Sequence, residues 1–143
     1  MKFPIYLDYN ATTPVDERVF DAMKPYFMEV FGNAASSGHA FGNQAKSAVE
    51  ESRNIIARAI NAMPEEIIFT SGATESNNLA IKGADKMLAD KGNHIITAVT
   101  EHKAVLDTCK SLEKDGVEIT YLTVDNEGCV HLSDLASAIN ERT

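Results

Sequence analysis

From residue 64 onward, short apolar segments alternate with longer segments of helical periodicity, and this alternation is the strongest constraint on the fold. The expected strands are residues 67–70, 94–99 and 117–124. The expected helices are residues 75–91, residues 103–114 and a last one from about Asp134, capped by Ser133. Strands that alternate with helices imply right-handed crossovers. The chain is therefore predicted to be an α/β protein with a mostly parallel sheet and flanking helices.

The first 60 residues have a different pattern. After a short extended start, Thr13 is placed to cap a helix, and Pro25 is expected to kink or restart that helix. Residues 31–38 are mostly small and predict a loop. Apolar positions three or four residues apart from Phe41 to Ile60 predict an amphipathic helix.

Charge and apolar content exclude several classes of function. The 143 residues carry 13 basic and 21 acidic side chains, a formal net charge of −8, so no nucleic-acid partner is expected. No apolar run approaches the roughly 20 residues that cross a bilayer, and no signal-peptide core is present. We therefore expect a cytoplasmic protein without a membrane partner. Cys109 and Cys129 lack CxxC spacing, which fits a reducing compartment and predicts no metal site.

Two loops at the carboxyl ends of expected strands are candidate sites, because ligands of open parallel sheets bind there. In the first loop, Gly72 permits a tight turn, Ala73 is small, and Thr74 adds a hydroxyl to the N–H groups of a helix's first turn. Such a helix end favours a phosphate or another anion. Glu75 would repel a phosphate and is expected to turn towards solvent or a partner. An ordinary capped helix is the alternative interpretation of this segment.

The second loop places His102 at the same expected edge of the sheet as Thr74. A neutral imidazole there can stack on a planar ring or pass a proton near neutral pH, whereas a surface histidine without function is the alternative. The neighbouring Lys103 is a poor candidate for a Schiff-base lysine, because nothing in the sequence indicates that it is desolvated. Cys109 falls on the apolar face of its helix and is expected to be a buried structural thiol.

Four motifs follow one another along the chain: YLDYNATTP at residues 6–14, FGN at 31–33, SGATESNN at 71–78 and TEHKAV at 100–105. Their order resembles that of the NifS/IscS-type cysteine desulfurases, enzymes of the class V aminotransferase group that depend on pyridoxal 5′-phosphate (PLP). The resemblance implies that residues 15–143 are the first part of the PLP-binding large domain of the fold-type I (aspartate aminotransferase-like) transferases. Residues 1–14 would be an N-terminal arm or small-domain segment.

The resemblance also implies roles for individual residues. Ala73 and Thr74 match the pair that binds the PLP phosphate. His102 matches the histidine that stacks on the PLP ring, and it is the candidate catalytic proton carrier. The residues that would border the substrate pocket are Asn10, Ala11, Thr12 and His39.

The activity implied by the resemblance is conversion of L-cysteine to L-alanine, with transfer of sulfur as an enzyme persulfide for iron–sulfur cluster or thio-cofactor synthesis. The implied partners are L-cysteine, the remainder of the same enzyme, iron–sulfur scaffold or sulfur-acceptor proteins, and a second copy in a homodimer. The family's Ser-x-His-Lys signature and nucleophilic cysteine loop do not occur here, so we expect a portion of such an enzyme that is inactive alone. Selenocysteine lyase, a class V aminotransferase and an inactive fold fragment are the alternatives.

Overall fold

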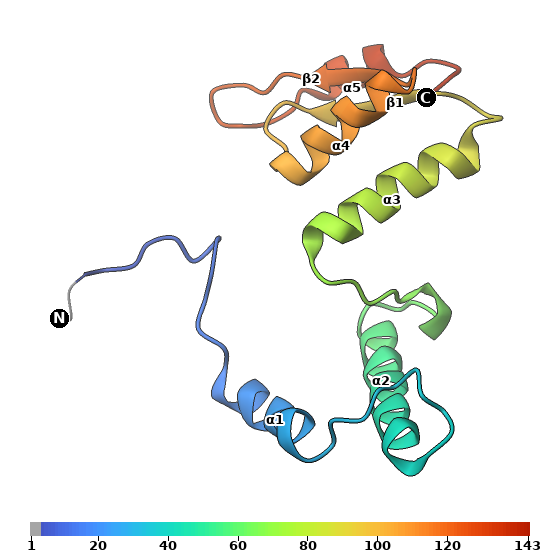
Figure 1. Ribbon diagram of the computed structural model, residues 1–143. Coiled ribbons are helices and arrows are strands. Elements are labelled where there is room, and N and C mark those ends of the chain that lie inside the picture. The colour runs from blue at the N-terminus through green and yellow to red at the C-terminus, as the bar shows by residue number, and fades with distance from the viewer. Residues whose placement is uncertain (1–3) are drawn as a thin grey trace. The chain divides into compact units, whose positions relative to one another are not determined.

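The computed structural model describes residues 4–143, which divide into two compact units between Ile68 and Phe69 (Figure 1). The elements of the first unit are α1 (Glu17–Met28), α2 (Ala40–Ala59) and the short 3-10 helix η1 (Pro64–Glu66). The elements of the second unit are α3 (Ala73–Leu88), β1 (His94–Ala98), α4 (Lys103–Lys114), β2 (Glu118–Leu122) and α5 (Leu132–Ala138). Within residues 4–143, no helix combines the length and the apolar character needed to cross a membrane.

Helix α1 begins later than the sequence predicts. Its N-cap is Asp16, whose carboxylate accepts the Arg18 N–H at 2.9 Å and forms an ion pair with the Arg18 guanidinium at 2.8 Å. The prediction of Thr13 as the cap is therefore wrong, because the acidic side chain three residues later caps the helix instead. Pro25 lies inside α1, which runs on to Met28, so the helix does not restart there.

Helix α2 confirms the amphipathic helix predicted in this region, and the expected loop at residues 31–38 precedes it. His39 is its N-cap, and the His39 ring accepts the Gly42 N–H at 3.2 Å. Gly42 is buried, and a Cβ atom added there would overlap the Ser36 carbonyl oxygen. Only glycine lets the loop backbone approach the helix this closely.

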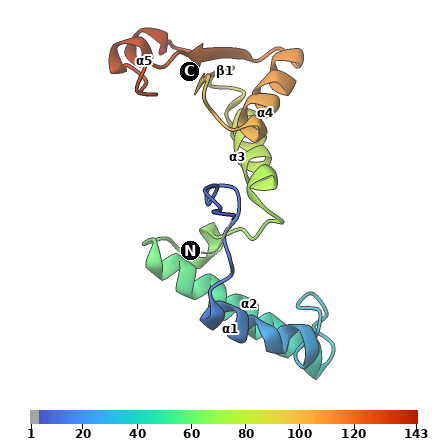
Figure 2. The ribbon, with the colours of Figure 1, turned by 90° about the vertical axis from the view of Figure 1, so that its left-hand side faces the viewer.

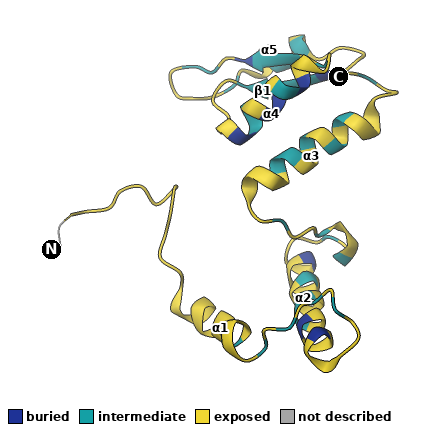
Figure 3. Ribbon diagram, viewed as in Figure 1, coloured by how far each residue is buried: buried dark blue, intermediate teal, exposed yellow. Residues whose placement is uncertain are grey.

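The second unit contains the sheet. Strands β1 and β2 pair in parallel, with a register that runs from His94 opposite Glu118 to Ala98 opposite Leu122. Helix α4 connects the two strands and packs against α3 and β2. Figure 3 shows buried positions on α4, where they form one face; these are Ala104, Thr108, Cys109 and Leu112. The predicted α/β class with a parallel sheet is confirmed.

Two predictions for the chain from residue 64 onward are wrong. Residues 67–70 form no strand, and no strand partner lies beside them among the residues that the structure describes. An apolar run becomes a strand only when another strand supplies its hydrogen bonds, and the boundary between the two units falls within this segment. The last helix begins at Leu132 with His131 as the N-cap, so Ser133 lies inside it and does not cap it.

Candidate functional site

The amino end of α3 is open. Its N-cap is Gly72, which has extended backbone angles (φ 162°, ψ 179°) and provides no side-chain cap. The first helical hydrogen bond is donated by Ser76 to the Gly72 carbonyl at 3.1 Å, so the N–H groups of Ala73 and Thr74 have no partner within the helix. The side chain of Thr74 is exposed. These N–H groups and this hydroxyl are therefore available to an anion.

The carboxylate of Glu75 is held away from these groups. It accepts hydrogen bonds from both the N–H and the hydroxyl of Ser71, each at 2.7 Å. The Ser71 N–H, and to a lesser degree the Ser71 hydroxyl, lowers the pKa of Glu75. The sequence predicts that Glu75 turns towards solvent or a partner, and in the structure this partner is Ser71. The sequence feature that points to this bond is an acidic residue at the third helical position, as in a capping box.

His102 is the N-cap of α4. Its Nδ1 accepts the Ala104 N–H at 3.1 Å, and its carbonyl accepts the N–H groups of Val105 and Leu106 at 2.8 and 3.2 Å. Because Nδ1 is an acceptor, the neutral ring carries its proton on Nε2. The ring is exposed, so Nε2 can exchange that proton. Lys103, the first residue of α4, is exposed as well.

The structure brings both candidate loops to one side of the second unit. Helices α3 and α4 pack against each other, and both begin on the side towards which β1 runs (Figure 1). Figure 2 shows the two helices lying next to each other from a second direction. The open helix end at Thr74 and the fixed imidazole of His102 therefore belong to the same unit. Such a pair suits a ligand that has both an anionic group and a planar ring.

The residues expected at the substrate pocket belong to the first unit. Residues 10–12 form an exposed turn in which the Asp8 carbonyl accepts the N–H groups of Ala11 and Thr12 at 3.1 and 3.4 Å. The Thr12 hydroxyl also bonds the Tyr6 hydroxyl at 2.7 Å. His39 is exposed, with Nδ1 engaged by the helix that it caps. The pocket role of Asn10, Ala11, Thr12 and His39 stays a prediction.

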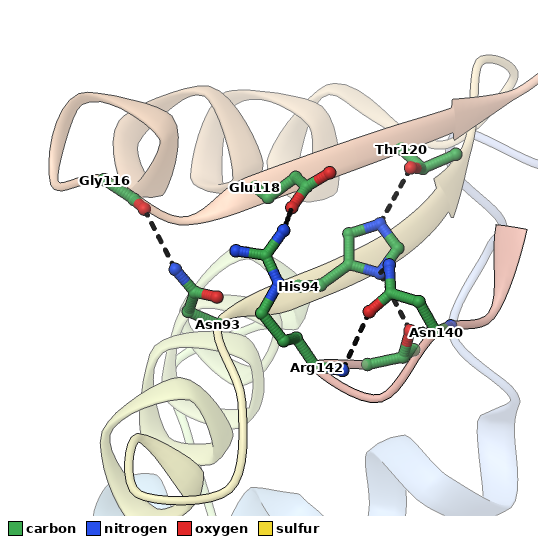
Figure 4. A network of polar contacts seen from close by, with 8 residues as sticks. Asn93, His94, Gly116, Glu118, Thr120, Asn140 and Arg142 are labelled. Carbon is green, nitrogen blue, oxygen red and sulfur yellow. Dashed lines mark hydrogen bonds and ion pairs between the residues drawn. The ribbon is translucent and has the colours of Figure 1, made fainter.

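A buried polar cluster that the sequence did not indicate surrounds His94 (Figure 4). His94 is 6% exposed, with Nε2 at 2.7 Å from the Thr120 hydroxyl and Nδ1 at 2.8 Å from the Thr143 hydroxyl. The Asn140 amide approaches Nδ1 at 3.3 Å, and Arg142 forms an ion pair with Glu118. The partners of His94 are 26 to 49 residues away in the chain, so no local motif in the sequence indicates them. The hydrogen bonds of this cluster connect the last residues of the chain to the start of β1.

A cavity of about 420 Å³ in the second unit lies next to this cluster. Its walls come from the later turns of α3, from the start of β1 and from the last two residues, and they include Ala84, Leu88, His94 and Thr143. None of the walls comes from Ala73, Thr74 or His102. The cavity is therefore separate from the open helix end and adds no group to it.

The two cysteines lie in different surroundings. Cys109 is fully buried, which confirms the expected structural thiol, and burial raises its pKa, with the charges of Glu113 and Glu101 adding to the effect. Cys129 is exposed. Among residues 4–143, no three His, Cys, Asp or Glu side chains are grouped so that they could hold a metal ion.

Comparison with known proteins gives a consistent result. The family described as "Aminotransferase class-V" matches residues 5–143. Cysteine desulfurase IscS of Neisseria meningitidis serogroup C (strain 053442) is 58% identical, and that of Rickettsia massiliae (strain Mtu5) is 55% identical, each over all 143 residues. The chain spans 35% of the length of these relatives.

Solved structures are also similar to this chain. One described as "NIFS-LIKE PROTEIN" has a TM-score of 0.90 and 39% sequence identity. The match covers 96% of this chain and 38% of the chain in that structure. Another, described as "SspA in complex with cysteine", has a TM-score of 0.86 and 43% sequence identity. The match covers 96% of this chain and 39% of the chain in that structure.

Proposed function

Because the chain belongs to the aminotransferase class-V family, we propose that it is part of a PLP-dependent cysteine desulfurase. The complete enzyme would convert L-cysteine to L-alanine and pass the sulfur on as an enzyme persulfide. Support comes from the relatives called cysteine desulfurase, which are 55–58% identical across the whole chain. A similar structure described as a complex with cysteine supports the same substrate.

The observation that carries the proposal is the open amino end of α3, which fits the phosphate of PLP. Gly72 provides no cap, Ala73 adds only a methyl group, and the Thr74 side chain is exposed. Glu75 keeps its carboxylate on Ser71. We therefore expect the N–H groups of Ala73 and Thr74 and the Thr74 hydroxyl to bind the phosphate, with the helix dipole adding to the attraction.

His102 would act on the ring end of the same ligand. When bound, PLP supplies an electron sink for the charge that develops on the substrate carbon. The bond from the Ala104 N–H to Nδ1 holds the His102 ring in one orientation, as stacking on a planar ring requires. The same bond leaves Nε2 as the atom at which His102 accepts or donates a proton.

Further parts of the proposal concern the surroundings of the site. Asn10, Ala11, Thr12 and His39 would border the substrate pocket, and the remainder of the enzyme would supply the covalent chemistry. We place the complete protein in the cytoplasm, where Cys109 and Cys129 would stay reduced. It would act as a homodimer and pass sulfur to iron–sulfur scaffold or other acceptor proteins.

The test uses the complete protein that contains this chain, with Thr74→Ala as the variant and Thr123→Ala as the control. Thr123 is exposed in the same unit and has no side-chain hydrogen bond among residues 4–143. Loss of a hydrogen bond to a charged group predicts PLP binding about tenfold weaker for Thr74→Ala, measured by titration, and no change for Thr123→Ala.

The activity assay measures the alanine that the complete protein releases from L-cysteine and the sulfide that an added thiol reductant then releases from the enzyme persulfide. Release of both products is the expected result. No release from cysteine would reject the desulfurase assignment. Faster turnover of selenocysteine would then indicate a selenocysteine lyase, and amino transfer to a 2-oxo acid would indicate an aminotransferase.

A further inference from the structure

The turn that leads into α3 is held by two sets of side-chain hydrogen bonds. We call the first the Ser71–Glu75 clip: the Glu75 carboxylate accepts the Ser71 N–H and the Ser71 hydroxyl, each at 2.7 Å. In the second set, the Thr70 hydroxyl donates to the Gly72 carbonyl at 3.2 Å and lies 2.6 Å from the Ser76 hydroxyl. Since Thr70 has one hydroxyl proton, Ser76 is the donor between the two hydroxyls.

Gly72 lies between these two sets of bonds, and its carbonyl also accepts the Ser76 N–H at 3.1 Å. A Cβ atom added at Gly72 would meet no atom within 4 Å other than those of its chain neighbours, so the space beside this residue on that side is open. Glycine also has the greatest backbone freedom of any residue. The shape of the turn therefore depends on the side-chain bonds around it.

The clip also decides where the negative charge of Glu75 lies. In an ordinary capping box, the carboxylate at the third helical position bonds the N-cap N–H. Here the carboxylate bonds Ser71, one residue before the N-cap. A carboxylate over the N–H groups of Ala73 and Thr74 would compete with an anionic ligand, and the clip prevents this.

We propose that Glu75 is a positioning residue for the cofactor phosphate: by holding Ser71 it keeps the turn at Gly72 in the shape that presents the Ala73 and Thr74 N–H groups. This inference rests on the proposed function, which supplies the phosphate. A loop that is already ordered binds more tightly, because ordering a loop on binding lowers the affinity. The Ser71 bonds lower the pKa of Glu75, so the extra strength that the charge gives the clip is present above the ordinary pKa of a glutamate and is lost as pH falls through the lower folded value.

Two substitutions separate positioning from charge. Glu75→Ala removes the clip and the charge, whereas Glu75→Gln removes the charge but keeps an oxygen that can accept the Ser71 N–H. Glu141→Gln is the matched control, because Glu141 is exposed in the same unit and makes no side-chain hydrogen bond among the described residues. The probes are PLP and, separately, inorganic phosphate, with affinities taken from the shifts of the Ala73 and Thr74 amide signals of the full chain by NMR.

Positioning predicts that Glu75→Ala binds both probes about five- to tenfold more weakly. Glu75→Gln should bind within about twofold of the unaltered chain or more tightly, and Glu141→Gln should not change. If Glu75→Ala binds as well as the unaltered chain, or better, the inference is wrong. Equal weakening in Glu75→Gln and Glu75→Ala would also overturn it, because charge and not the clip would then govern binding.

Amide hydrogen exchange without any ligand tests the clip itself. The Ser71 amide should exchange at least about tenfold faster in Glu75→Ala than in the unaltered chain, while the Leu112 amide in α4 should keep its rate if the unit stays folded. An unchanged Ser71 rate would overturn the inference even where the proposed function holds. If neither probe shifts Ala73 and Thr74 in the unaltered chain, the proposed phosphate site fails, and the positioning role fails with it.

Discussion

Replacing His94 with alanine should destabilise the second unit by about 2 kcal/mol. His94 is 6% exposed and makes two short hydrogen bonds, to Thr120 at 2.7 Å and to Thr143 at 2.8 Å. Each such bond contributes about 1 kcal/mol net, and the 3.3 Å approach of Asn140 is too long to add much. The substitution also leaves the half-buried Thr120 hydroxyl without its partner.

Urea unfolding, followed through the amide signals of β1 by NMR, measures this effect. With a urea dependence of about 2 kcal/mol per M, a loss of about 2 kcal/mol lowers the midpoint by about 1 M. His131→Ala is the matched control, since His131 is exposed in the same unit and its side chain makes no capping bond. Equal midpoints for His94→Ala and His131→Ala would refute the reasoning, because the buried hydrogen bonds of His94 would then contribute nothing.

Two further predictions concern other buried positions. In the folded chain a thiol reagent should label exposed Cys129 but label Cys109 only after unfolding, as mass spectrometry can show, because Cys109 is fully buried and burial raises its pKa. Labelling of both thiols at similar rates would contradict this. Gly42→Ala should cost about 1–3 kcal/mol of stability by thermal unfolding because the new methyl group overlaps the Ser36 carbonyl, whereas Gly38→Ala, which meets open space, should be nearly neutral. Equal effects at the two glycines would show that the loop adjusts freely.

The helices were predictable because their hydrogen bonds are local. The predicted helix at residues 103–114 is α4 itself, and α2 begins and ends one residue before its predicted bounds. Caps were less predictable, since several polar residues compete within one turn. Asp16 caps the helix in place of Thr13, and its carboxylate also pairs with Arg18.

The candidate site could be read from the sequence in part. The small residues at Gly72 and Ala73 beside Thr74 are compatible with an open helix end and with an ordinary capped one, and α3 has the open end. The clip between Glu75 and Ser71 was missed, although both residues lie in the same motif, because the sequence alone leaves several partners open to a carboxylate. The capping role of His102 was missed because the sequence alone also leaves several partners open to its imidazole.

Spacing along the chain is enough to establish the order of the helices and of strands β1 and β2, the α/β class and the motifs that identify the family. The folded structure alone shows that residues 67–70 are not a strand and that His94 is buried. Strand pairing and the burial of a polar side chain depend on partners far away in the chain, and for His94 those partners are Thr120 and Thr143. Local pattern cannot select such partners, because they meet only when the unit folds.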